Sequence, residues 1–459
     1  MMKIKASLTK TVMIIVLAPI ILISALILGI NIKNDKDNVE QRYPPVTHIT
    51  YEPVLIVDLS RKWLIKDQSV KKEMRETTIT ITVYPKDSKK NIKNISYNIL
   101  DSTVAGDIEL DDNLEAKIII DENDLSPGKY TIEFIMNSVD FKPKNKKLQF
   151  NVSYPIYVAW TTDWEGLNTP LSTMTQAMVE MEQISDENDL PITHMYNPRY
   201  LLPTYDQTKS STYTNWIRDR TVNGDDDLGI HLHMFWDMVE TAGVEAIKEP
   251  SYYNDHQEGY AIASALYSYE DYKQITKWAI QQFEANDLPT PTSFRAGGWM
   301  ADLHNIKAVQ DAGILIDSTG KTKSSTGKIF PDNWDLDILC GPHYISETNK
   351  NDCNKSDNSK LQIMEIPNNG GDSYRLTVDE LIERFDQNYT NHLPLEKPRT
   401  VIYLSHPEYG HTTEFPKISK TFKHISKFKA ENDDGPVIYS TLSQIKDSWK
   451  DNKWTDMKY

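Results

Sequence analysis

The stretch IYVAWTTDWEG, residues 156–166, decides the fold, because it is an apolar run of strand-forming residues that ends in Asp163 and Glu165. From residue 156 onward, similar apolar runs alternate with amphipathic helical patterns, which is typical of a largely parallel sheet wrapped by helices. The predicted strands are IYVAWT (156–161), LGIHL (228–232), TSFRA (292–296), ILID (314–317), LQIMEI (361–366), VIYLS (401–405) and VIYS (437–440). The predicted helices are Ser172–Ile184, Tyr269–Ala285, Leu303–Ala312, Val378–Tyr389 and Ile418–Ala430. This order predicts an α/β fold with an incomplete, seven-stranded (β/α) barrel.

Most of these strands end in ionisable or glycine-flanked residues. The polar clusters are Asp163 to Gly166, His231 to His233, Arg295 to Gly298, Asp317 with Ser318, and Ser405 with His406. The active sites of such barrels lie at the carboxyl ends of the strands. The clusters are therefore expected to meet at one mouth of the barrel.

The spacing within two clusters predicts a metal site. Residues two apart on an extended segment point the same way, so Asp163 and Glu165 share one face and His231 and His233 share another. Two imidazoles with one or two carboxylates suit zinc and leave a coordination position for water. The alternative is a pair of histidines that merely hydrogen-bond at a strand end. Asp163 can be either a metal ligand or the catalytic base.

Three further residues are candidates for catalysis. His406 suits a general acid because its ordinary pKa is close to neutral pH, although it could be a surface histidine before a proline. Arg295 either orients a carboxylate base or pairs with an acidic residue at a strand end. Asp317 either holds His406 in one tautomer or caps a turn.

Tryptophans accompany three parts of the predicted site. Trp164, Trp236 and Trp299 each neighbour a polar cluster, and aromatic faces at the mouth of a cleft suit sugar rings. Burial in the core is the more common fate of a tryptophan. One or two of the three are therefore expected to line the site as substrate-binding residues.

The N-terminal third has a different pattern. Residues 1–10 carry three lysines, and residues 11–32 contain an uncharged apolar run long enough to cross a bilayer. The charge distribution predicts a cytoplasmic N-terminus and a single-pass cell-membrane protein whose bulk lies outside the cytoplasm. A cleaved signal peptide is the alternative. Residues 33–45 are expected to be a linker.

Residues 46–153 contain short alternating runs separated by turn residues. Examples are TTITITVYP (77–85), EAKIIID (115–121), KYTIEFIM (129–136) and KLQFNVS (147–153). Period-two strands at this spacing predict a small immunoglobulin-like β-sandwich. It has no catalytic constellation and is expected to act as a spacer or recognition module.

Charge and cysteine content narrow the possible partners. The chain has 50 Lys and Arg against 66 Asp and Glu, a net charge of −16. This excess of negative charge argues against nucleic acid as a partner. Cys340 and Cys353 are the only two cysteines, and in an exported chain they predict a local disulfide, with two unpaired thiols as the alternative.

The order of the motifs from about residue 154 to 449 resembles the polysaccharide deacetylase (NodB-homology) family of carbohydrate esterases. The family's T-F-D-D-G is similar to TTDWEG at 161–166, and its H-[ST]-x-x-H is similar to HLH at 231–233. Its R-x-P-[FY] is represented only by Arg295, and its later D and L-x-H motifs resemble Asp317 and residues 404–406. The resemblance implies a deacetylase-like catalytic barrel at 154–459, with Asp163 as base, His231 as metal ligand, Arg295 as orienting residue and His406 as acid.

The chain departs from the family pattern at two ligand positions. Trp164 stands where the family has a metal-binding Asp, so either Glu165 or Asp163 must supply that carboxylate. Phe235 stands where the second histidine would be, so His233 must replace it. The pattern resembles an uncharacterised, divergent branch of the family, and it does not identify the polymer or any protein partner.

The implied reaction is hydrolysis of N-acetyl groups on a polysaccharide by a zinc-bound water. Two alternatives stay open. The first is a non-catalytic protein that binds glycans at the cell surface. The second is a metal-dependent O-acetyl esterase or glycosidase that uses the same cavity.

Overall fold

The computed structural model describes residues 50–252, 258–322, 334–353 and 359–457. The predicted cytoplasmic segment 1–10, anchor 11–32 and linker 33–45 lie outside these residues. Within the described ranges, no helix is both long enough and apolar enough to span a bilayer. The predicted single-pass location at the cell membrane is corrected on this finding.

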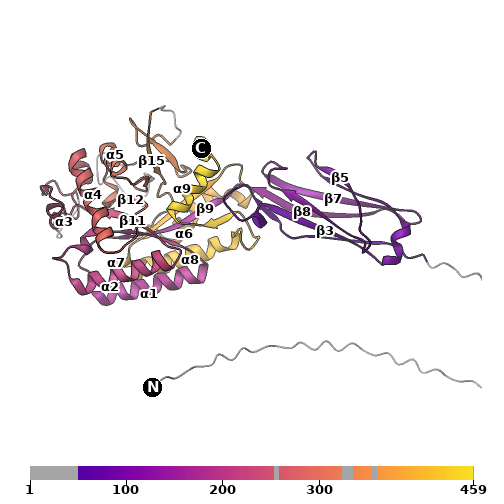
Figure 1. Cartoon of the computed structure of the whole chain (residues 1–459), viewed down its shortest axis with the longest axis horizontal. Helices are drawn as coiled ribbons and strands as arrows, with labels where there is room; N and C mark the ends of the chain where they lie inside the picture. The colour runs from indigo at the N-terminus through magenta and orange to yellow at the C-terminus, as the bar shows by residue number, and fades with distance from the viewer. Residues whose placement is uncertain (1–49, 253–257, 323–333, 354–358, 458–459) are drawn as a thin grey trace, which may run out of the picture. The chain divides into compact units, whose positions relative to one another are not determined.

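The first strands form two separate sheets (Figure 1). One sheet has the order β1–β3–β6, made of Val54–Leu59, Glu76–Tyr84 and Glu115–Asp121. The other has the order β2–β8–β7–β4–β5, made of Trp63–Ile65, Lys144–Ser153, Gly128–Ser138, Ile92–Ile99 and Ala105–Ile108. The four predicted strands correspond to β3, β6, β7 and β8. The immunoglobulin-like topology of this region stays a prediction.

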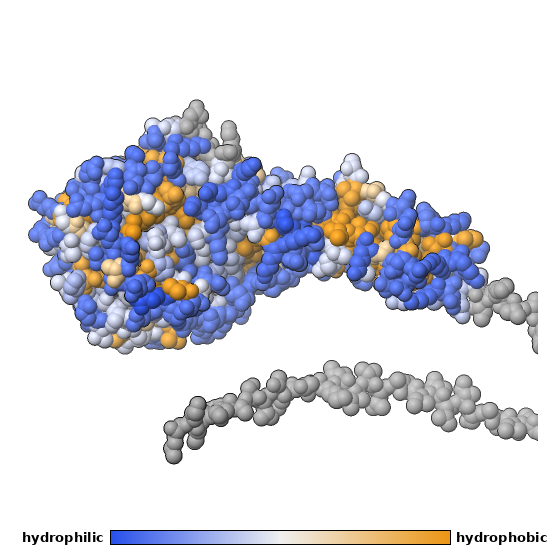
Figure 2. All heavy atoms as spheres, viewed as in Figure 1, coloured by the Kyte–Doolittle hydropathy of each residue, from blue (hydrophilic) through white to orange (hydrophobic). Residues whose placement is uncertain are grey.

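Alternation along these strands explains their packing. In β3, every second side chain from Thr77 to Val83 is buried and the others are partly exposed. The buried face of β3 shares a hydrophobic core with Ile132 and Phe134 of β7. The opposite faces meet solvent, and Figure 2 shows hydrophobic patches on an otherwise mainly hydrophilic surface there. Val54, Ile56 and Ile119 are among the exposed apolar residues.

A third, larger sheet of ten strands follows, in the order β14–β15–β13–β12–β11–β10–β9–β17–β16, with β18 also paired to β9. Its strands are β9 (Ile156–Trp164), β10 (Ile192–Tyr196), β11 (Asp227–Leu232), β12 (Ser293–Ala296), β13 (Ile316–Asp317), β14 (His343–Ser346), β15 (Lys360–Glu365), β16 (Gly371–Asp372), β17 (Arg399–Ser405) and β18 (Val437–Tyr439). All seven predicted strands are present, and β10, β14 and β16 are additional. The strand pairs found in the described residues leave β14 and β16 as open edges, so they do not close a full barrel.

Helices pack around this sheet (Figure 1). They are α1 (Leu171–Asn188), α2 (Gln207–Arg218), α3 (Trp236–Thr241), α4 (Tyr269–Ala285), α5 (Leu303–Asp311), α6 (Val378–Asn388), α7 (Pro407–Tyr409), α8 (Phe415–Ile425) and α9 (Leu442–Asp451). A capping box begins α6, because the side chains of Thr377 and Glu380 each accept a hydrogen bond from the other's backbone amide. In the ten-stranded sheet, every strand pair of the described residues except β14 with β15 is parallel, so the carboxyl ends of the parallel strands gather on one side.

Candidate metal and catalytic site

Three buried ligand atoms converge at the ends of β9 and β11. Oε2 of Glu165 lies 2.5 Å from Nε2 of His233 and 3.8 Å from Nε2 of His231. One ligand atom from each of the three residues lies within 4.8 Å of the others. All three side chains are at most 4% exposed, and none of these three atoms has a hydrogen-bond partner among the residues that the structure describes. Buried polar atoms without partners are costly, so this cluster calls for a bound group.

The hydrogen bonds of the Nδ1 atoms of His231 and His233 indicate what kind of ligand the cluster could bind. Nδ1 of His231 lies 3.1 Å from the carbonyl oxygen of Arg295, and Nδ1 of His233 lies 2.7 Å from the carbonyl oxygen of Tyr260. A carbonyl only accepts hydrogen bonds, so each Nδ1 carries a proton, and in the neutral imidazole each Nε2 presents a lone pair to the carboxylate of Glu165. Lone pairs facing a carboxylate repel one another unless a cation lies between them. The donor set of two imidazoles and one carboxylate therefore fits a divalent metal ion, and zinc in particular.

The backbone beside His233 is shaped to allow this arrangement. Gly297, at the end of β12, lies so close that a Cβ atom added to it would be 2.6 Å from Cγ of the His233 ring. The ring is also stacked on Tyr260, with 4.0 Å between the ring centroids. Only glycine permits this approach, which explains the glycine that follows Ala296.

Asp163 has a separate position next to this cluster. Its Oδ1 accepts a 2.7 Å hydrogen bond from Nη1 of Arg295, which is fully buried. Arg295 also donates to the hydroxyl of Thr161 and to the main-chain oxygen and hydroxyl of Ser318, so its guanidinium is fixed from three sides. The other oxygen of Asp163 lies 3.8 Å from Nδ1 of His231, the nitrogen that faces the carbonyl oxygen of Arg295. This places Asp163 beside the ligand cluster and is consistent with the role of a base.

His406, which follows β17, completes the ionisable residues of the site. Its Nε2 lies 3.2 Å from Oε1 of Glu165, and its Nδ1 lies 3.2 Å from Oε1 of Glu414. Burial opposes the charged imidazolium, but the carboxylates of Glu414, Glu165 and Asp372 outweigh it and hold the pKa of His406 well above its usual value. His406 is therefore a proton donor at neutral pH.

Glu165 is held in the ionised form by the same contacts. Burial alone would raise its pKa, yet positive charge on His233 and close polar contacts with His231, His233 and His406 bring the pKa well below its ordinary value. A metal ion bound between these residues would supply the same positive charge while leaving His231 and His233 neutral. Its main-chain amide donates to Glu408, a buried residue of α7. Burial and the charge of Glu165 raise the pKa of Glu408 to about 7.

The structure separates the three tryptophans. Trp299 lines the cavity, and its role in substrate binding stays a prediction. Trp164 does not line the cavity: it is fully buried and packs against His194, Tyr196, Tyr200, Tyr213 and Trp216 on the opposite face of β9, because Asp163 and Glu165 occupy the face toward the cavity. Trp236 starts α3 and stacks beside Lys248, also outside the cavity. The predicted substrate-binding role of Trp164 and Trp236 is wrong for this reason.

Asp317 does not orient His406. Its Oδ1 accepts from the amide and hydroxyl of Thr319, and it shares a buried environment with Glu365. Burial and the nearby charge of Asp317 raise the pKa of Glu365 well above its usual range. The residues beside Nδ1 of His406 are instead Glu414 and Asp372.

The site opens into a cavity of about 260 Å³. Sequence reasoning missed several of its lining residues, namely Tyr260, Asp372, Tyr374, Arg375 and Tyr409. All of them lie in loops, in short helices or at the end of the two-residue strand β16. No period in the sequence marks these positions, although Tyr409 lies in the polar stretch that follows His406.

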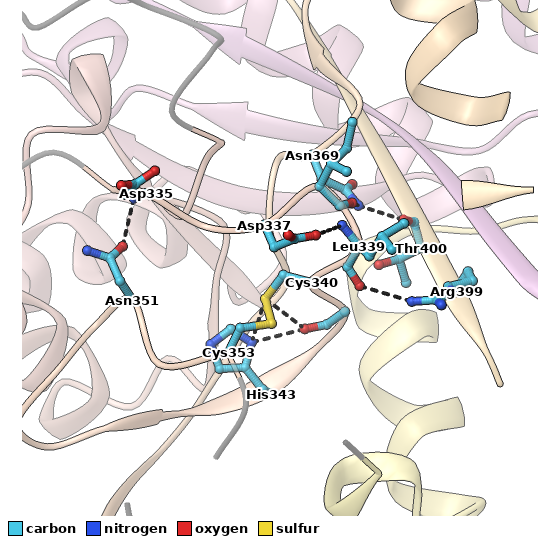
Figure 3. Close-up of a disulfide and its surroundings, with 12 residues drawn as sticks. Asp335, Asp337, Leu339, Cys340, His343, Asn351, Cys353, Asn369, Arg399 and Thr400 are labelled. Atoms are coloured by element: carbon cyan, nitrogen blue, oxygen red, sulfur yellow. Dashed lines mark hydrogen bonds between the residues drawn. A yellow bond between two sulfur atoms is a disulfide. The ribbon is translucent and has the colours of Figure 1, made fainter. Parts of the chain in front are cut away.

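Figure 3 shows the loop that carries the two cysteines. Cys340 and Cys353 form a disulfide with their Cα atoms 5.8 Å apart. The same loop contacts the neighbourhood of the cavity, because Nζ of Lys350 donates to the carbonyl oxygen of Ala301, two residues after Trp299.

Comparisons with known proteins give matches among solved structures only. Neither the protein-family models nor the curated proteins include a match. Among solved structures, a putative polysaccharide deacetylase from Mycobacterium smegmatis is 14% identical, with a TM-score of 0.41 over 65% of this chain and 91% of that chain. A putative glycoside hydrolase/deacetylase from Parabacteroides distasonis is 9% identical, with a TM-score of 0.40 over 65% and 71%. The family 4 carbohydrate esterase from Streptomyces lividans is 10% identical, with a TM-score of 0.30 over 62% and 98%.

The similar solved structures thus include members of the family that the motifs resemble. Their TM-scores are all below 0.5, so an assignment of function must rest on the residues of the site.

Proposed function

We propose that this chain is a metal-dependent hydrolase that removes N-acetyl groups from a polysaccharide. The observation that carries the proposal is the convergence of Nε2 of His231, Nε2 of His233 and Oε2 of Glu165, buried and without hydrogen bonds. These three atoms would hold the metal, with zinc as the best match to the donor set. A bound divalent ion supplies an acidic water and polarises the acyl oxygen.

Asp163 and His406 would carry out the two proton transfers that amide hydrolysis needs, Asp163 as the base and His406 as the acid. Arg295 fixes one carboxylate oxygen of Asp163, which leaves the other oxygen to take a proton from the attacking water. His406 is protonated and can give its Nε2 proton to the departing amine. The products would be acetate and a free amino sugar, and the proton gained by Asp163 balances the one lost from His406.

The cavity supports a sugar substrate. Trp299 and Tyr409 offer aromatic faces to a pyranose ring, and Tyr374, which is 55% exposed, lies at the open side. The volume of about 260 Å³ suits one sugar residue and its acetamido group, and the remainder of a chain would continue past Tyr374.

The test is acetate release by the purified full chain. The zinc-loaded protein should release acetate from chitotetraose, a chelator should abolish the release, and added zinc should restore it. Binding of the glycan without any release, with metal bound, would instead favour a glycan-binding protein. Absence of stoichiometric metal would refute the proposed site directly.

A further inference from the structure

Arg375 occupies a position in the cavity that the deacetylation chemistry does not use. It follows β16, lines the same cavity as His231 and His406, and its side chain is 41% exposed. Its Nε lies 3.7 Å from Oδ2 of Asp372, a distance at the long end of an ion pair. The guanidinium is thus available to a molecule that enters the cavity.

Asp372 is a weak counter-ion for Arg375. It is buried, and its other oxygen lies 3.9 Å from Nδ1 of His406, so its charge is shared between two cations. Burial also raises the pKa of Asp372 to about 6. One shared carboxylate therefore faces both the imidazolium and the guanidinium.

A second cation, Lys321, lies next to Trp299, which lines the cavity. Nζ of Lys321 lies 4.6 Å from the ring centroid of Trp299, and the side chain is buried. Burial and the nearby Arg375 lower the pKa of Lys321 to about 8. At neutral pH Lys321 therefore adds positive charge beside Trp299.

We propose that the substrate carries a carboxylate and that Arg375 binds this carboxylate while the acetamido group lies at the metal site. A planar guanidinium matches a carboxylate with two parallel hydrogen bonds, which lysine cannot reproduce. The aromatic side chains of Trp299, Tyr374 and Tyr409 would hold the sugar ring between the two anchors. This inference rests on the proposed function, because it assigns the substrate class of the same site.

The experiment compares three glycans that share N-acetylglucosamine. Chitotetraose is neutral, a hyaluronan tetrasaccharide carries uronate carboxylates, and an N-acetylglucosaminyl-N-acetylmuramic acid disaccharide carries a lactyl carboxylate. Arg375→Gln should raise KM for at least one acidic glycan about tenfold relative to its effect on chitotetraose, with a smaller change in kcat. Arg375→Lys should give an intermediate KM. The acidic glycan that responds identifies the source of the carboxylate.

Lys423→Gln is the matched control, since it removes one positive charge from an exposed position on α8, outside the cavity residues. It should leave the preference for the acidic glycan unchanged. If Arg375→Gln raises KM equally for neutral and acidic glycans, or if Lys423→Gln has the same effect, the inference is wrong.

Binding measurements separate this inference from the proposed function. Calorimetry of the three glycans with Asp163→Asn, in the presence of zinc, does not depend on turnover. Arg375-dependent binding of an acidic glycan without acetate release by the unmodified protein would support the inference and refute the deacetylase. Acetate release with no preference between neutral and acidic glycans would support the deacetylase and refute the inference about Arg375.

Discussion

Nδ1 of His231 lies 3.1 Å from the main-chain oxygen of Arg295, while the side chain of Arg295 holds Asp163. One residue therefore fixes the tautomer of a metal ligand and the orientation of the proposed base. This coupling depends on the parallel register of β11 and β12, in which His231 stands beside Arg295.

Removal of a ligand should remove the metal. His231→Ala and His233→Ala should each lose most bound zinc, measured by elemental analysis of the purified protein. At about 100-fold excess over the dissociation constant, zinc should stabilise the unmodified protein by about 2.7 kcal/mol, and both variants should lose this gain. His304→Ala, on α5, removes a histidine whose Nε2 hydrogen-bonds a backbone carbonyl, and this variant should keep the metal. Full zinc content in either ligand variant would contradict the assignment.

Asp163→Asn distinguishes a base from a ligand. The amide keeps the size of the side chain but cannot accept the proton, so kcat should fall by about 10²- to 10⁴-fold with zinc content unchanged. A parallel loss of zinc would show that Asp163 is a metal ligand. Acetate release and metal analysis on the same preparation decide between these outcomes.

Glu414→Gln should shift the pH dependence of the reaction. The negative charge of Glu414 helps to raise the pKa of His406, so its removal lowers that pKa. A general acid works in its protonated form, and activity is lost as the pH rises through its pKa. The alkaline limb of the kcat/KM profile should therefore move to lower pH. Glu383→Gln, at an exposed position on α6, should leave the limb in place.

Glu365→Gln should change how stability depends on pH. Burial and Asp317 raise the pKa of Glu365 in the folded protein, so the folded state holds a proton that the unfolded state releases above its ordinary pKa of 4.5. The free energy of unfolding of the unmodified protein thus falls as pH rises from about 4.5 toward the raised value. The glutamine variant should lose less stability over this range in denaturant titrations. An unchanged pH slope would show that Glu365 titrates normally.

Loss of the disulfide should destabilise its loop. Cys340 and Cys353 are 13 residues apart. In the chain-entropy model, a disulfide that closes a loop of this length raises the free energy of unfolding by about 3 kcal/mol, because it restricts the unfolded chain. The double variant Cys340→Ser with Cys353→Ser should unfold at a lower temperature, as should the unmodified protein in reductant. Because the chain has only two cysteines, reductant should not affect the double variant.

The parts of the fold that have a local period are predictable from the sequence. Apolar runs mark seven strands, whereas β10 escapes prediction because Thr193 and His194 place polar groups inside a fully buried strand. The hydroxyl of Thr162 and the carboxylate of Asp226 satisfy the ring of His194, and these partners are 32 residues away in each direction. The helix α2 escapes prediction because its sequence QTKSSTYTNWIR is mostly polar.

The residues of the site also fall into a predictable and an unpredictable group. The predictable residues lie at strand ends, where position in the sequence predicts position in space; they are Asp163, Glu165, His231, His233, Arg295 and His406. Glu414 and Asp372 reach His406 from segments whose arrangement depends on the folded chain, so the sequence offers Asp317 as its partner instead. The burial of Trp164 away from the cavity could have been predicted from the sequence. Two carboxylates on one face of a strand put the residue between them on the other face.

Building the T-F-D-D-G motif of the polysaccharide deacetylases into this chain would take more than one substitution, because Trp164 is buried away from the cavity. A Trp164→Asp substitution would put a carboxylate among Tyr196, Tyr200 and Tyr213, and would add no ligand to the cavity. Loss of Glu165 at any intermediate step would take away the carboxylate that faces both histidines. Chains with the same kind of site are therefore better recognised by carboxylates on the cavity-facing side of the strand that corresponds to β9 than by an exact match of consecutive residues.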